Sequence, residues 1–134
     1  MTDHYILVGQ TPVPFEGGLI EWCEWRATAD MRVAFTRVFD CEVSTVFLGS
    51  DMAFRRLHPG QPPILFESMA FWPGDGGYEQ TRCATWLEAE EQHRAMCREV
   101  ARPAAVWAWV RRAWRWYWYE AGQDARAAWR ELRG

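Results

Sequence analysis

Three side chains in the middle of the chain could together carry out acid–base chemistry. Glu67 lies inside the apolar run 63–71, where an unpaired carboxylate would cost several kcal/mol unless it were protonated or paired. Asp51 and His58 belong to the polar loop that precedes this run. A carboxylate and a histidine within hydrogen-bond reach can act as general acid and base. One hypothesis is therefore a small hydrolase with Glu67, Asp51 and His58 as catalytic groups.

Glu67 also has a structural interpretation. Arg32, Arg37 and Arg82 are plausible ion-pair partners, and structural ion pairs at such positions are common. The chain contains no G-x-S-x-G, Walker or G-x-G-x-x-G motif and no catalytic cysteine signature. The balance of these signals is against an enzyme, and no cofactor is expected.

The loop 49–63 contains two glycines and three prolines, and long loops of this kind are often functional. Arg55 and Arg56 could bind a phosphate or nucleotide through bidentate contacts. The alternative is a solvated surface loop without a ligand.

A metal site is the weaker interpretation of the cysteines and histidines. His93 and Cys97 share a helical face, and Cys83 precedes them by ten residues. Zinc sites usually show closer pairs such as C-x-x-C, so no metal site is predicted and the four cysteines are expected to be reduced thiols. His93 is expected to be exposed or to cap a helix beside Glu90 and Glu91.

The C-terminal segment 102–134 carries six of the ten tryptophans, and it has seven arginines against three acidic residues. Residues 1–100 have eight arginines against fifteen acidic residues. Such asymmetry can mark a tail that meets an acidic partner, although the tail could also dock on the acidic body. The candidate partner-binding residues are Arg111, Arg112, Trp114, Arg115, Trp116 and Trp118.

Four kinds of binding partner for this tail remain open. Aromatic residues on two sides of a helix favour an interface with a partner protein or with a second copy. Alternating arginine and tryptophan also suits stacking on unpaired bases or an interfacial membrane position. The segment is too rich in arginine to span a bilayer, so no transmembrane segment is expected.

The pattern of expected strands and helices that position these residues predicts an α+β fold. A small antiparallel sheet of four to five strands is expected, with one helix after the first strand and two C-terminal helices. The expected strands are 5–8, 32–39, 42–48, 64–71 and 79–84, and the expected helices are 19–30, 86–101 and 103–133. Thr85 and Glu88 have capping-box spacing at the start of the second helix.

The domain organisation follows from this order of elements. We expect one α+β domain over residues 1–101 and a helical extension over 102–134 that packs on the domain or on a partner. The N-terminus shows no basic and apolar pattern of a secretory signal, so the cytoplasm is the expected location.

Three ordered segments carry a family resemblance: Ser44-Thr-Val-Phe-Leu-Gly49, Pro63-Ile-Leu-Phe-Glu-Ser-Met-Ala-Phe71, and Thr81-Arg-Cys-Ala-Thr-Trp-Leu-Glu-Ala-Glu-Glu-Gln-His93. Together they resemble a widespread family of short proteins of tailed bacteriophages and prophages, over about residues 4–100. Gln92 and Leu87 depart from the family pattern, and the aromatic tail lies outside it. The resemblance implies a non-enzymatic phage accessory protein that binds a host protein or small ligand, with counter-defence as one purpose, and it transfers no catalytic residue.

Overall fold

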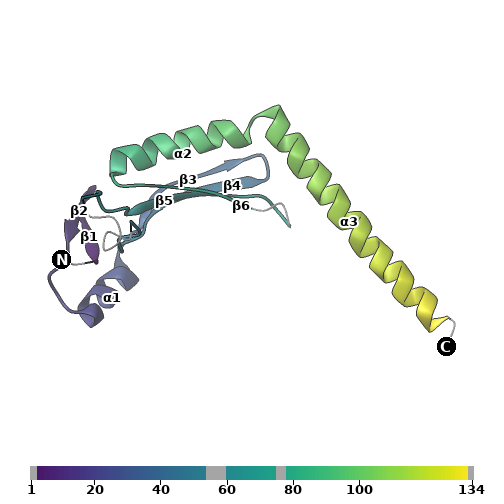
Figure 1. Ribbon diagram of the computed structural model, residues 1–134, viewed down its shortest axis with the longest axis horizontal. Helices are drawn as coiled ribbons and strands as arrows, with labels where there is room; N and C mark the ends of the chain where they lie inside the picture. Colours follow the sequence, from purple (N-terminus) through teal and green to yellow (C-terminus); the bar gives the residue numbers. More distant parts are fainter. Residues whose placement is uncertain (1–2, 54–59, 75–77, 133–134) are drawn as a thin grey trace.

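The computed structural model describes residues 3–53, 60–74 and 78–132 and has the α+β fold that the sequence predicts. Its elements are, in chain order, β1 (Tyr5–Val8), β2 (Thr11–Pro14), α1 (Leu19–Thr28), β3 (Arg32–Val38), β4 (Cys41–Phe47), β5 (Phe66–Phe71), β6 (Tyr78–Cys83), α2 (Trp86–Val100) and α3 (Pro103–Glu131). Figure 1 shows α2 lying along the main sheet, with β1, β2 and α1 gathered at one end and α3 leaving from the other.

The N-terminal hairpin differs from the expectation. No strand was expected between 5–8 and the helix that begins at Leu19, but β2 pairs antiparallel with β1 after a turn at Gly9, whose φ is +64°. A strand of a two-stranded sheet bonds along one edge only, so Pro12 and Pro14, at alternate positions, can place their ring nitrogens on the open edge. The strands therefore form two sheets, and the first helix follows the second strand.

The main sheet has four antiparallel strands in the order β3-β4-β5-β6. The expected strands 32–39 and 42–48 are present as the antiparallel hairpin of β3 and β4, which turns at Phe39 and Asp40, where Phe39 has a positive φ of 53°. Strand β5 is central in this sheet, because it pairs with β4 on one side and β6 on the other.

Helix α2 covers one face of this sheet. The predicted capping box is present: the Thr85 hydroxyl accepts from the Glu88 amide, and the Glu88 carboxylate accepts from the Thr85 amide. The buried residues of α2 recur at spacings of four and three, which places them on one helical face against the strands. They are Ala89, His93, Met96 and Val100.

The core consists of two clusters on the covered face. One joins the sheet to the N-terminal hairpin and comprises Tyr5, Phe47, Leu65, Phe66, Cys83 and Ala89, with Trp25 of α1 packed against it. The other joins the sheet to α2 and the start of α3 and comprises Cys41, Val43, Ala70, Trp72, Met96 and Val100. The opposite face of the sheet is less covered, since Phe35 and Phe71 expose 45% and 43% of their surface.

Candidate interaction site on the carboxy-terminal helix

Helix α3 is attached to the body by its first two turns. Trp109 stacks on Trp72 with ring centroids 5.7 Å apart, and its indole N–H donates to the Pro73 carbonyl at 3.3 Å. Ala105 and Val106 pack against the same cluster. Pro103, at the first helical position, begins α3 without losing a hydrogen bond that an interior residue would need.

Beyond these turns α3 projects from the body (Figure 1). The helix spans 29 residues, and none of them is buried. Its large exposed apolar side chains are Trp107, Trp114, Trp116, Tyr117, Trp118, Tyr119 and Trp129. So many exposed aromatic side chains on one helix make α3 the candidate interaction site of the described residues.

The side chains of α3 are sorted by type around the helix axis. At 3.6 residues per turn, six apolar positions, besides Val110, fall within about a quarter of the circumference. They are Trp107, Trp114, Trp118, Ala121, Ala125 and Ala128, and we call them the α3 stripe. The stripe lies on a different side from Trp109, so attachment to the body leaves it free.

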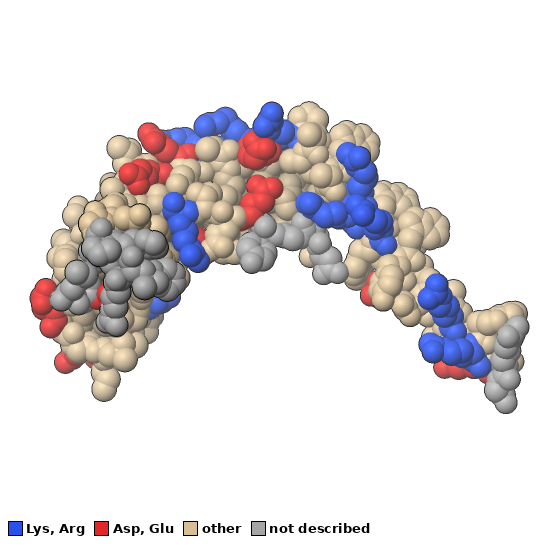
Figure 2. Space-filling model, viewed as in Figure 1, with Lys and Arg blue, Asp and Glu red and all other residues tan. Residues whose placement is uncertain are grey.

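The charges of α3 lie on separate sides of the helix. By the same periodicity, the arginines fall within about a third of the circumference and the acidic residues lie on the far side. The arginines are Arg111, Arg112, Arg115, Arg126 and Arg130, and the acidic residues are Glu120, Asp124 and Glu131. Figure 2 shows basic side chains along α3, with acidic ones beside its C-terminal part.

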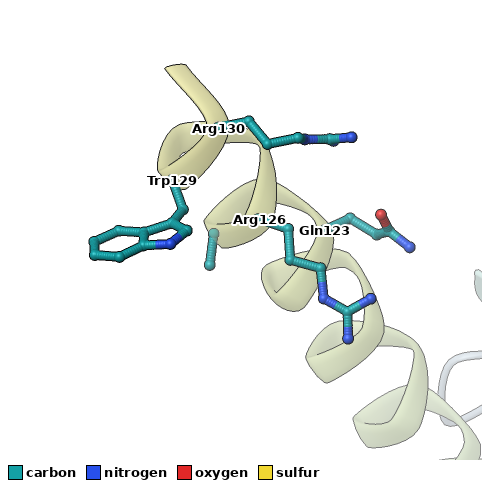
Figure 3. Close-up of a pocket in the computed structure, with 5 residues that line it drawn as sticks. Gln123, Arg126, Trp129 and Arg130 are labelled. Atoms are coloured by element: carbon teal, nitrogen blue, oxygen red, sulfur yellow. The ribbon is translucent and has the colours of Figure 1, made fainter. Parts of the chain in front are cut away.

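Among the described residues, two hollows on α3 are lined by side chains of this helix alone. One lies against Ala113, Trp114 and Tyr117. The other is lined by Gln123, Ala125, Arg126, Trp129 and Arg130, and Figure 3 shows its tryptophan pointing to one side of the helix while Gln123, Arg126 and Arg130 point to the other. A single helix does not enclose a ligand, so these hollows suit the side chains of a macromolecular partner better than a small molecule.

The structure places all six partner-binding candidates of the sequence on exposed positions of α3. It does not bring them onto one surface. Trp114 and Trp118 belong to the α3 stripe, whereas Trp116 lies on nearly the opposite side. The alanines of the stripe were missed by sequence reasoning, although their spacing of three and four residues from Trp118 was available as a signal.

The catalytic candidates have structural partners. Glu67 pairs with Arg82, one of the expected partners, with the arginine Nε 2.7 Å from its carboxylate, and it also accepts from Gln80. Asp51 accepts from the amides of Ala53 and Ile64 at 2.9 and 3.0 Å. These contacts tie neighbouring strands and the start of a loop together. His58, Arg55 and Arg56 lie outside the described residues.

His93 is buried, so the expectation of an exposed or capping histidine was wrong. Its ring nitrogens lie 2.9 Å from the hydroxyls of Thr36 and Thr45, and the Thr45 hydroxyl lies 2.7 Å from that of Ser68. Burial, and secondarily the charge of Arg94, lower the pKa of His93. The neutral histidine therefore completes a polar network between α2 and three strands.

The signal for this network was present in the sequence. His93 lies four residues after Ala89 and three before Met96, which is the spacing of one buried face. Every second residue of β4 and β5 is buried, and Thr45 and Ser68 each occupy one of these buried positions. The two residues are paired across the strands.

Two cysteines are expected to resist thiol reagents. Burial, with help from nearby Glu79, raises the pKa of Cys41 to about 11, and burial with Glu88 raises the pKa of Cys83 to about 11. Relative to a thiol of pKa 9, each should present roughly one hundredfold less thiolate at pH 8.

Timed titration with a disulfide reagent at pH 8 tests this expectation. Cys23, which is exposed, should react fast, and the half-exposed Cys97 should react more slowly. Cys41 and Cys83 should react only after urea is added. Four equally fast thiols would contradict this order.

Two further properties follow from the part of the chain that the structure describes. In residues 3–53, 60–74 and 78–132, no group of three His, Cys, Asp or Glu side chains is placed to hold a metal ion. Over the same ranges, no helix combines the length and the apolar character needed to cross a bilayer.

Comparisons with protein-family models, with curated proteins and with solved structures found no match to this chain. Its own geometry, an antiparallel α+β body with a projecting aromatic helix, therefore carries the functional argument.

Proposed function

We propose that this protein acts by binding another macromolecule through α3, without catalysis, as an accessory protein of a tailed bacteriophage or prophage. The observation that carries the binding role is the exposure of the aromatic side chains of α3 beyond Trp109. Tryptophan, tyrosine and arginine dominate binding energy at protein interfaces, and α3 contains six tryptophans, two tyrosines and five arginines. The phage origin and a host target, with counter-defence as a purpose, rest on the resemblance of residues 4–100.

Affinity capture with matched variants tests the binding role. The tagged wild type, a Trp114→Ala/Trp118→Ala variant and a Leu87→Ala control are compared on lysate of a bacterial host. Leu87 is also a large exposed apolar residue, but it lies on α2. The wild type and the control should retain the same macromolecule, and the double variant should lose it. Equal retention by all three proteins, with equal solution masses, would contradict the proposal.

Nucleic-acid binding is a second candidate, favoured by the arginines that share one side of α3. Arginine next to aromatic residues such as Tyr119 and Trp129 suits the backbone and bases of a single strand. Each phosphate contact releases counterions, so affinity should fall steeply between roughly 50 and 200 mM salt. Fluorescence anisotropy of a labelled single-stranded oligonucleotide would show this. Binding that ignores salt, or that survives Arg111→Gln/Arg115→Gln, would remove this candidate.

A further inference from the structure

We infer that the occupant of the α3 stripe is a second copy of this chain, whose own α3 lies antiparallel to the first. The inference rests on the proposed binding role of α3 and names its partner. Along the stripe the residues follow one another at spacings of seven, four, three, four and three. This is the heptad spacing by which two helices pack their side chains into each other.

The stripe is divided by side-chain size. Its first half carries Trp107, Trp114 and Trp118, and its second half carries the alanines. If two copies run antiparallel with Trp118 facing Ala121 of the second copy, the same alignment places Trp114 opposite Ala125. Large residues then meet small ones in each of these layers, which is how facing helix surfaces fill space. Parallel pairing in register would instead place tryptophan on tryptophan and leave layers of alanine only.

Net charge is divided at nearly the same point of the helix. Residues 103–119 contain three arginines and no acidic residue, whereas residues 120–131 contain three acidic residues and two arginines. In an antiparallel arrangement the two halves of each copy lie at the level of the opposite halves of the other, and the arginines of both copies fall on the same flank, outside the apolar stripe. The antiparallel arrangement also opposes the two helix dipoles, which is the favourable orientation.

The tryptophans of the stripe supply about half the area of a specific dimer interface. Trp107, Trp114 and Trp118 expose 57–65% of their surface. At about 200 Å² for a tryptophan side chain, they provide on the order of 400 Å². This is about half of the roughly 800 Å² that each partner of a specific dimer buries. The alanines and the neighbouring Tyr117, which is 59% exposed, add to it.

Light scattering of the full chain across a concentration series tests the inference. The wild type should have twice the chain mass, and Trp114→Ala/Trp118→Ala should have the mass of one chain. A Trp116→Ala/Tyr119→Ala control removes the same kind of surface from other sides of α3 and should remain dimeric. Circular dichroism verifies that each variant is folded. A wild type with the mass of one chain throughout, or a control that dissociates as the double variant does, overturns the inference.

A size exchange tests the antiparallel alignment. Trp114→Ala alone leaves a gap in two layers, and Ala125→Trp alone overfills them, so each variant should dimerise at least tenfold more weakly than wild type. A mixture of the two restores one large and one small residue per layer, and its heterodimer should regain most of the wild-type affinity. A mixture no tighter than the separate variants overturns the antiparallel pairing.

The outcomes also separate this inference from the proposed function. A monomeric wild type that captures another macromolecule, and loses it with Trp114→Ala/Trp118→Ala, overturns the second copy and leaves the binding role intact. A monomer that carries salt-removable absorbance at 260 nm overturns the second copy in favour of nucleic acid. A monomer with no α3-dependent binding overturns both proposals.

Discussion

Replacing Phe47 by alanine is expected to lower the free energy of unfolding by about 3–5 kcal/mol, because it removes a buried aromatic ring and leaves a cavity. Phe47 exposes 1% of its surface and lies at the junction of three elements. Its ring centroid is 5.3 Å from that of Phe66 on β5 and 6.3 Å from that of Trp25 on α1. Its loss therefore loosens the sheet and the attachment of α1 together.

Phe71→Ala is the matched control for Phe47→Ala. It makes the same substitution on the neighbouring strand β5 but on the open face, where Phe71 is 43% exposed. Its loss of stability should be clearly smaller. Urea denaturation at a fixed protein concentration measures both changes, since association through α3 would make apparent stability depend on concentration. Equal losses would show that the open face of the sheet is also covered in solution.

Replacing His93 by leucine is expected to cost about 1–3 kcal/mol, because the buried Thr45 hydroxyl loses a partner. Thr45 and Ser68 are fully buried and have no access to water that could replace it. A Thr45→Val/Ser68→Ala/His93→Leu variant removes the polar groups together and should recover most of the loss. A triple variant less stable than His93→Leu would contradict this account of the network.

The same histidine makes stability depend on pH. The unfolded chain binds a proton at His93 with a pKa near 6.5, and the folded chain binds it only at lower pH because burial lowers the pKa. The contribution of the neutral histidine is therefore complete above about pH 6.5 and is lost as the pH falls below it. Unfolding measured from pH 8 to pH 5 should show this decrease in wild type.

His93→Leu is the reference for this pH dependence. The other titrating groups remain in both proteins, so the difference between the two curves isolates His93. The difference should narrow as the pH falls, by at most about 1.4 kcal/mol per pH unit. Parallel curves would show that His93 titrates alike in the folded and unfolded chains.

Local patterns explain why much of the fold could be predicted. The capping box of Thr85 and Glu88 closes within four residues, and the β3–β4 hairpin closes through a short turn. The Glu67–Arg82 pair lies on strands adjacent in sequence, which face each other in register. In each case the chain between the partners is short, so the pattern alone brings them together.

The structure differs from the expectation where contacts with residues distant in the sequence outweigh the local pattern. Pro12 and Pro14 indicate a turn by themselves, and they become strand residues only because Leu7 and Tyr5 lie opposite them. His93, next to acidic neighbours, resembles a surface residue. Its burial depends on Thr36 and Thr45, which lie 57 and 48 residues away along the chain.

The sequence by itself determined the α+β class, the long C-terminal helix and the residues that share each side of that helix, because helical periodicity depends only on spacing. Only the tertiary structure decided what each side meets. Trp109 stacks on Trp72, 37 residues earlier in the chain, whereas Trp114 and Trp118 lie beyond the end of the body. The physical reason is that periodicity assigns a side chain a direction, and only the packing of the rest of the chain determines whether anything lies there.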